Sequence, residues 1–348
     1  MTFGLALIFV LVLTLPFLFH RVEKDLELFL FVMGVAAAAV GGAFSWKLAG
    51  TALEDPLPIT AAVLGMGFLF RWTRGLIERG VRALLLRVPV KLFVFGLILG
   101  LGLVSSVITV IIASLVLVEV VSLLKLDRGS EVKIVVLACF ALGLGAVLTP
   151  IGEPLSTIAV SKLSGPPYHA GFWFLLQRLG VWIVPGIVGF ALLSLFFHDR
   201  QVQRAEESLE ESAEEVARDE SYRDIFLRAG KVYLFVVALV LLGEGFKPVI
   251  DRYVVSLPAW MLYWLNMSSA VLDNATLTAA ELSPAMEMGQ IRDVLLGLLL
   301  AGGMLIPGNI PNIIAASKLK IGMKEWAKFA VPVGLVAMAL YFVLLLIF

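Results

Sequence analysis

Long apolar runs separated by short charged segments make up most of this 348-residue chain. A helix needs roughly 20 apolar residues to cross about 30 Å of hydrocarbon, so each long run predicts a membrane span. Basic residues follow the first run instead of preceding it, so we interpret it as a retained helix rather than a signal peptide. With one shorter run at 57–70, the predicted spans are 3–19, 26–46, 132–163, 171–197, 229–246, 290–320 and 325–348.

Two other apolar stretches, 91–124 and 257–283, have polar residues at their centres. The first carries Ser105, Ser106 and Thr109, and the second carries five polar residues between positions 266 and 274. A long apolar stretch with a polar centre is either two spans or one re-entrant hairpin. The charges on either side decide between these, because cytoplasmic loops hold an excess of Lys and Arg.

The flanking charges favour hairpins. Residues 71–91 carry six basic residues and one acidic residue, and residues 125–133 carry three basic residues. Both segments are therefore assigned to the cytoplasm, and the stretch between them starts and ends on one side. Following the chain onward makes 257–283 a second hairpin, entered from outside. The predicted fold is an all-α polytopic membrane protein with about eight spanning helices, two opposed hairpins, and both termini outside.

An internal repeat relates the two halves of the chain. GEPLSTIAVSKL at 152–163 aligns with GNIPNIIAASKL at 308–319 at a constant offset of 156, with six of twelve positions identical. Upstream, the serine pair 105–106 aligns with the pair 268–269 at an offset of 163. Under the charge assignment the copies begin on opposite sides. The sequence therefore predicts an inverted-topology repeat, an architecture typical of secondary transporters.

The repeat divides the chain into four predicted parts. Residues 1–56 have no counterpart and are expected to form two N-terminal scaffold helices. Repeat 1 covers 57–197 and repeat 2 covers 229–348, and each consists of a span, a hairpin, a broken helix and a span. The segment between them, 198–228, holds ten acidic residues and five arginines, and we expect a charged cytoplasmic linker.

Proline and glycine interrupt the helix in each aligned segment, within 150–154 and 307–311. Non-helical backbone at membrane depth is tolerated only where it is buried in protein or lines an aqueous cavity. Two hairpin turns and two helix breaks in matched halves therefore point to one shared central site. Lys162 and Lys318 end the helices after the breaks, and we expect their side chains to extend toward the two membrane faces.

Composition excludes the soluble classes of protein. The chain is 60% hydrophobic and 16% charged, with a mean hydropathy of +0.98. Soluble domains are about half apolar and a quarter charged, so no water-facing surface accommodates this excess. Lys plus Arg and Asp plus Glu each number 27, which gives no basic surface for nucleic acid. The single cysteine, Cys139, excludes a disulfide framework.

The densest polar cluster follows the second serine pair and contains Asp273. An aspartate deep in the membrane costs roughly 2.5–3.5 kcal/mol on insertion scales, so it is by default a functional-site hypothesis. The alternative is that Asp273 caps a helix near the outer surface. Glu153, in the first break, is the second candidate carboxylate, and its alternative role is a glutamate favoured by the dipole at a helix start.

Glu119 and Glu281 follow their serine pairs by 14 and 13 residues. A place near the membrane surface is expected for Glu119, while for Glu281 the surface and the ion path stay open. Oxygen-only donors surround the candidate site, which suits a hard cation such as Na⁺. The predicted cation ligands are Asp273, Asn274, Glu153, Thr276, Ser268, Ser269, Asn309, Asn312, Ser105, Ser106 and Thr109.

Two of these segments resemble known transporter motifs. SAVLDNATLT, from Ser269 to Thr278, resembles the second hairpin motif of NhaD-type sodium/proton antiporters. GNIPNIIAAS at 308–317 resembles a helix break of the same ion transporter superfamily, which also includes arsenite exporters and divalent anion/sodium symporters. Within it the chain is most similar to a small family of archaeal and bacterial predicted cation transporters of unassigned function. The resemblance covers about 57–348 in architecture and some forty residues in specific motifs.

The resemblance implies a homodimer with scaffold and transport domains that moves ions by an elevator motion. Carried over by position, Asp273 and Asn274 are the ion-binding acid and its amide partner. The first hairpin departs from the antiporter pattern, because Val110 and Ile111 stand where an Asp-Asn pair is expected. Glu153 would then supply the missing carboxylate, and the departure leaves ion stoichiometry open.

The leading hypothesis is a secondary cation transporter, most specifically a Na⁺/H⁺ antiporter in the cytoplasmic (inner) membrane of a prokaryote. A carboxylate that binds either a proton or Na⁺ couples the two fluxes by competition. The partners expected are membrane lipid, small cations and a second copy of the chain, with no cofactor and no nucleic acid. The alternative is a Na⁺-coupled anion or dicarboxylate symporter of the same fold. A channel and an intramembrane hydrolase are remote alternatives, because the latter requires paired Asp residues or a buried base.

Overall fold

The computed structural model describes residues 2–19, 21–22, 25–54, short pieces between 56 and 79, 87–124, 126–197, 222–253, 257–272 and 274–347. Every regular element in these ranges is a helix. Five of the helices are long and apolar enough to cross a membrane, and the prediction of an all-helical polytopic membrane protein is therefore confirmed. They are Val90–Ile108, Arg128–Ala146, Phe174–Ser194, Ile225–Val249 and Met323–Ile347.

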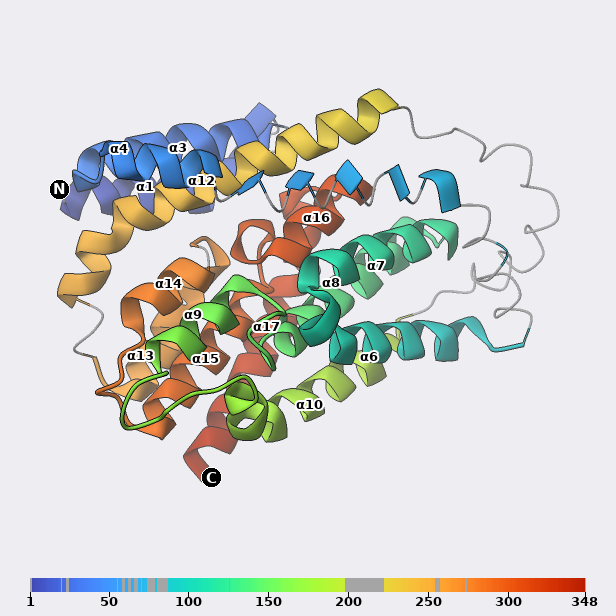
Figure 1. Cartoon of the computed structure of the whole chain (residues 1–348). Helices are drawn as coiled ribbons and strands as arrows, with labels where there is room; N and C mark the ends of the chain where they lie inside the picture. The colour runs from blue at the N-terminus through green and yellow to red at the C-terminus, as the bar shows by residue number, and fades with distance from the viewer. Residues whose placement is uncertain are drawn as a thin grey trace.

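Four helices form one layer across the top of Figure 1. The longest of them, α12, packs along α3, and Lys231 on α12 forms an ion pair with Glu27 on α3. It begins seven residues before the predicted span, inside the segment expected to be linker. The layer consists of α1 (Thr2–Leu18), α3 (Leu26–Gly41), α4 (Trp46–Glu54) and α12 (Tyr222–Tyr253). Residues 198–221 and most of 57–86 lie outside the described residues.

The remaining helices pack beneath this layer in two sets with the same order. Each set is a two-part segment, a helix with a break, and a long final helix. The first set is α6 (Val90–Ile108), α7 (Val110–Leu124), α8 (Arg128–Ala146), α9 (Pro154–Lys162) and α10 (Phe174–Ser194). The second set is α13 (Ala259–Leu265) with the short 3-10 helix η1 (Asn266–Ala270), α14 (Asn274–Glu281), α15 (Met288–Gly302), η2 (Ile306–Gly308), α16 (Ile310–Leu319) and α17 (Met323–Ile347).

The two helix breaks lie where the prolines and glycines predicted them. The chain leaves the helix between residues 147 and 153 in the first set and between 303 and 309 in the second. The first predicted turn was too wide, however. Ser105 and Ser106 still belong to the last turn of α6, and Thr109 alone separates α6 from α7 with a positive φ of 71°. The serines stay helical because their hydroxyls bond to carbonyls three residues earlier, Gly102 and Leu103.

The loop at 125–133, which the charge analysis assigned to the cytoplasm, contacts the basic loop that follows α16. Arg128, at the start of α8, bonds to the carbonyls of Leu319 and Lys320 at 2.8 Å and forms an ion pair with Glu325 at 2.7 Å. We call this end the basic end. At the other end, the Tyr168 hydroxyl donates to the Met286 carbonyl, which joins the two loops that carry few charges. We call it the opposite end, and both chain termini lie at the left of Figure 1, on its side.

Each set packs one of its helices against a helix of the other set. Helix α7 of the first set packs against α16 of the second, and α14 of the second packs against α9 of the first. Near the end of α16, Lys318 lies 3.5 Å from the carboxylate of Glu119 on α7. Near the end of α9, Lys162 donates to the carbonyl of Leu282, just after α14, at 3.0 Å. Both amines are thus bound by groups of the other set. Glu119 is buried in the protein, and its depth in the membrane stays a prediction.

Candidate functional site

The two helix breaks have the same backbone geometry at positions 156 residues apart. Val147 ends α8 with φ −73° and ψ −16°, and Gly303 ends α15 with φ −73° and ψ −17°. Glu153 precedes α9 with φ −157° and ψ 162°, and Asn309 precedes α16 with φ −154° and ψ 148°. Each break therefore brings one helix C-terminus, with free carbonyls, close to one helix N-terminus, with free N–H groups.

The polar residues before each break also correspond. The Ser105 hydroxyl lies 3.2 Å from the carbonyl of Leu142 on α8, and the Ser269 hydroxyl lies 3.2 Å from the carbonyl of Leu298 on α15. Leu142 and Leu298 are again 156 residues apart. Both serines are fully buried. Each two-part segment is therefore joined to its own broken helix at the same point.

Three predicted ligands of the second half converge on Gly302, the last residue of α15. The Nδ2 atom of Asn312 donates to the Gly302 carbonyl at 2.8 Å and to the Leu305 carbonyl at 2.9 Å. Asn274 lies so close that a β-carbon on Gly302 would be 2.7 Å from its Oδ1 atom. The Ser269 hydroxyl bonds to that same Asn274 side chain. We call Ser269, Asn274, Gly302 and Asn312 the break cluster.

The break cluster contains oxygen atoms that its own hydrogen bonds do not use. Both N–H groups of Asn312 are used, so its buried Oδ1 is left with no hydrogen-bond partner in the described part of the chain. Ser269 has one hydroxyl proton and two acceptors, the Leu298 carbonyl and Asn274. Turning the Asn274 amide over lets its Nδ2 donate to Ser269 while Ser269 donates to Leu298. That arrangement leaves one amide oxygen of Asn274 and one of Asn312 without a donor, and such oxygens suit a hard cation.

The first half has a parallel set of contacts around Gly152. The Val110 N–H donates to the Gly152 carbonyl at 2.9 Å, and the Thr149 hydroxyl donates to the Ser106 carbonyl at 2.5 Å. Glu153 follows directly and is 5% exposed. A buried carboxylate at a helix N-terminus gains from the dipole of α9. Glu153 therefore lies at the first break as predicted, and Thr109 lies at the turn beside it.

Asn309 connects the two halves. It precedes α16 in the second half, yet a β-carbon on Gly143 of α8 would lie 2.6 Å from its Nδ2 atom. Its Oδ1 accepts a hydrogen bond from the Ile310 N–H at 2.9 Å. Because α8 belongs to the first half, this contact places the second break beside the first broken helix. The buried predicted ligands thus occupy two neighbouring breaks rather than separate parts of the fold.

Three predicted ligands are either outside the described residues or only partly buried. Asp273 lies outside the described residues, and so does the side chain of Thr276 on α14. Ser268 is only partly buried in η1, next to the fully buried Ser269. Among the described residues there is no group of three or more His, Cys, Asp and Glu side chains able to hold a metal ion. The described donors are amide, hydroxyl and carbonyl oxygens, with Glu153 as the carboxylate.

A family model of proteins of unknown function, DUF1646, matches residues 2–348. The chain belongs to the DUF1646 family. No curated protein matches it. The match extends over both halves and the N-terminal helices, so the family model includes both breaks and the upper layer.

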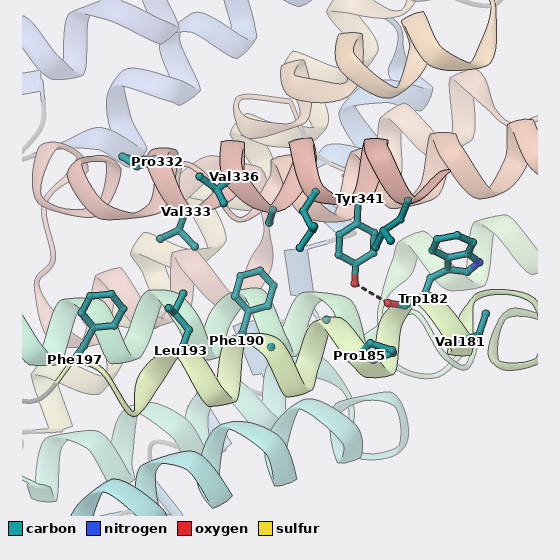
Figure 2. Close-up of a pocket in the computed structure, with 15 residues that line it drawn as sticks. Val181, Trp182, Pro185, Phe190, Leu193, Phe197, Pro332, Val333, Val336 and Tyr341 are labelled. Carbon is teal, nitrogen blue, oxygen red and sulfur yellow. Dashed lines mark hydrogen bonds between the residues drawn. The ribbon is translucent and has the colours of Figure 1, made fainter. Parts of the chain in front are cut away.

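A groove of this DUF1646 chain lies between α10 and α17. It has a volume of about 860 Å³, and no acidic or basic side chain lines it. Figure 2 shows Phe190, Leu193 and Val336 facing the space, with the Tyr341 hydroxyl bonded to the Trp182 carbonyl at 2.6 Å. Because that hydroxyl is satisfied, the groove presents an apolar surface that suits acyl chains better than ions.

Sequence reasoning missed three residues of the site. Thr149 fixes the first break to α6, Gly302 gives room for Asn274, and Gly143 gives room for Asn309. Thr149 has a usable signal, because it is a polar residue directly before the predicted break. The two glycines have none, since the chain contains 31 glycines and only the fold shows which ones a neighbouring side chain approaches.

Proposed function

We propose that this protein is a secondary active cation transporter, and most specifically a Na⁺/H⁺ antiporter. The observation that carries the proposal is the pair of helix breaks with matching backbone geometry, each beside buried oxygen donors. Paired helix breaks at the interface of two repeats are how secondary transporters build ion sites near the middle of the membrane. A helix C-terminus supplies carbonyl oxygens to a cation, and a helix N-terminus stabilises a carboxylate.

The reciprocal packing supports an inverted-topology repeat. Two-fold related halves exchange equivalent contacts, as the pairs α7–α16 and α14–α9 do. Helices α8 and α15 enter from the basic end and the opposite end respectively, and both stop inside. The basic end, with Arg128 and Lys320, is then cytoplasmic by the excess of positive charge, and both termini are outside. On this basis the chain has about eight spanning helices and two opposed re-entrant hairpins.

Competition between a proton and Na⁺ at a carboxylate would couple the two fluxes. The break cluster offers neutral oxygens, and Glu153 and Asp273 are the carboxylates of the two halves. A bare carboxylate is expensive to carry through a low-dielectric core, so the empty site resists crossing unless it binds a proton or Na⁺. Asp273 is proposed as the exchanging acid and Glu153 as the second.

An elevator motion of the lower helices against the upper layer completes the proposal. The contact between them includes Ala229, Val232 and Val236 of α12, packed against Ile111 and Ile310. These side chains carry no directional bonds, so sliding breaks no hydrogen bond between them. A homodimer in the prokaryotic inner membrane, joined through the upper layer, would hold that layer fixed.

A Na⁺-coupled anion symporter is the second candidate. The N-termini of α9 and α16 both point into the breaks, and helix N-termini bind carboxylates. Against it, Glu153 would repel an anion at the first break. The two candidates differ in whether a proton or an anion accompanies the cation.

Proton flux in liposomes tests the proposal. Purified protein is reconstituted with a trapped pH gradient and a pH-sensitive dye, and Na⁺, Li⁺, K⁺ and Ca²⁺ are added in turn. The antiporter account predicts that a monovalent cation collapses the gradient, and that Asp273→Asn abolishes this response. No response to any cation, with correctly inserted protein, would overturn it. Sodium-driven uptake of small dicarboxylates in the same liposomes would favour the symporter instead.

A further inference from the structure

A second buried acid, Glu281, lies apart from the break cluster. It ends α14 and is 2% exposed. Its carboxyl lies beside the side chain of Asn266, and its buried Oε2 has no hydrogen-bond partner among the residues that the structure describes. A buried carboxylate needs either a counter-charge or several donors to remain ionised.

Asn266 is built into the same site. It is fully buried in η1, and its Nδ2 donates to the Val294 carbonyl on α15 at 3.1 Å. Its Oδ1 has no hydrogen-bond partner in the described part of the chain. An ionised Glu281 would thus leave two acceptor oxygens, one on each side chain, without a donor. A proton on Glu281 removes the charge and supplies a donor to this pair of side chains.

The first half also has a buried acid, Glu119 on α7, and this acid has a counter-charge. Glu119 lies beside Lys318, whose Nζ is 3.5 Å from its carboxylate. Because Ser105 corresponds to Ser269 in these contacts, the position equivalent to Asn266 in the first half is Gly102, which has no side-chain amide. One half therefore carries an ion pair, and the other half carries an acid with an amide partner.

On the helices packed against α14, four described basic side chains are bound to groups other than Glu281. Lys162 on α9 donates to the carbonyl of Leu282. On α12, Lys247 lies 4.0 Å from Glu244, and Lys231 is paired with Glu27 of α3. Arg292 on α15 is bound to its neighbour Asp293 at 3.0 Å, and the ring of Trp182 lies under its guanidinium.

The position of the site relates it to the break cluster. Asn266 bonds to Val294, whereas Ser269 bonds to Leu298, four residues further along α15. Four residues correspond to about 6 Å along a helix. Because α15 begins at the opposite end, the side chain of Asn266 lies about one turn closer to that end than the side chain of Ser269.

From this arrangement we propose that Glu281, held by Asn266, is a proton-binding site distinct from the break cluster, on the side of the opposite end. Its role in exchange, taking up the proton that leaves as the cation binds, rests on the proposed function. The proton resides on the carboxyl as a neutral acid, and its release leaves a carboxylate that accepts from the Asn266 amide. In the described part of the first half, the buried acid Glu119 is paired with Lys318 instead.

Infrared spectroscopy of the full protein in lipid bilayers tests this site without measuring transport. The wild type is expected to show a carbonyl stretching band of a buried protonated carboxyl, which disappears as the pH is raised. The band should be absent in Glu281→Gln. It should persist in the matched double variant Glu119→Gln/Lys318→Met, which neutralises the buried acid of the first half together with its counter-charge.

A second variant keeps the test decisive if Glu281→Gln does not fold. Asn266→Ala retains the acid but removes its amide partner, so the band should move to higher frequency and its titration midpoint should change. An unchanged spectrum in either variant would overturn the proposal. If cations fail to drive proton flux while the band is still lost in Glu281→Gln, the proposed function falls and the proton site stands. Flux in the wild type, with an unchanged band in Glu281→Gln, overturns the site alone.

Discussion

The side chain of Asn274 occupies the space that a side chain on Gly302 would need. A β-carbon on Gly302 would lie 2.7 Å from Asn274 Oδ1 and 3.0 Å from the Gly308 carbonyl. These distances are shorter than van der Waals contact, so the glycine is required by its neighbours and not by its own backbone angles.

Gly302→Ala should therefore displace Asn274 and disturb the second break. Overpacking of this kind costs about 1–3 kcal/mol, and cation-driven flux should fall with it. Gly289→Ala is the matched control, because Gly289 lies on the same helix with open space around it. Thermal unfolding in detergent and flux in liposomes check both. Equal behaviour of the two variants would contradict the packing described for Gly302.

The Glu119–Lys318 pair should show strong coupling in a double-mutant cycle. Both side chains are largely buried, at 7% and 12% exposure. Removing one partner of a buried pair costs about 3–5 kcal/mol, because the other charge is left uncompensated. Glu119→Gln or Lys318→Met alone should thus lower the unfolding temperature clearly, and the double variant should recover much of the loss. Additive losses would show that the two residues do not depend on each other.

Asp127 should stabilise the protein in a pH-dependent way. It caps α8 by accepting from the Ser130 N–H at 3.0 Å. Burial raises its pKa, but hydrogen bonds from Ser130 and Gly129 and the nearby Lys133 outweigh this and hold the pKa below its usual value. A depressed pKa means that the stabilisation is complete above the unfolded value of about 3.9 and is lost as the pH falls through the folded value.

Asp127→Ala should cost about 1 kcal/mol at pH 7, the usual value of a helix cap. The difference from the wild type should persist at pH 5 and shrink below pH of about 4. Thermal unfolding across this range measures it, and Asp127→Asn, which keeps a capping oxygen, is the control. A difference that stayed constant down to low pH would argue against the ionised cap.

Single cysteines test the assignment of the two ends. In a Cys139→Ala background, which removes the one buried native thiol, Ser164→Cys reports on the opposite end and Lys328→Cys on the basic end. A membrane-impermeant thiol reagent added to intact cells should label Ser164→Cys only. Labelling of Lys328→Cys should require opened cells. The reverse pattern would invert the topology.

The sequence predicted the fold best at the helix breaks, where the backbone conformation changes and proline, glycine and polar residues are clustered. The prolines and glycines at 150–154 and 307–311 predicted both breaks because they are clustered there, whereas single prolines such as Pro185 and Pro332 lie inside continuous helices. The first hairpin turn was predicted too wide, since Ser105 and Ser106 bond to their own helix and remain in it. The short helix α4 was not predicted, as its nine residues carry too little apolar length.

The sequence pattern could not predict contacts between helices that are far apart along the chain. Lys318 was expected to extend to the membrane face, yet its partner Glu119 comes from the other half of the chain. The role of Asn266 depends on Glu281 and Val294, which lie 15 and 28 residues later. Periodicity shows which residues share one helix face, but it carries no information about the helix opposite.

Counterflow of labelled Na⁺ is the most direct test of the central claim that this protein is a cation carrier. Liposomes loaded with unlabelled Na⁺ are diluted into a trace of ²²Na⁺ without a membrane potential. A carrier exchanges internal for external ions, so the label should accumulate transiently above its equilibrium level, saturate with external Na⁺, and be lost in Asp273→Asn. Uptake that rises only to equilibrium without saturating, or no uptake at all, would contradict the account.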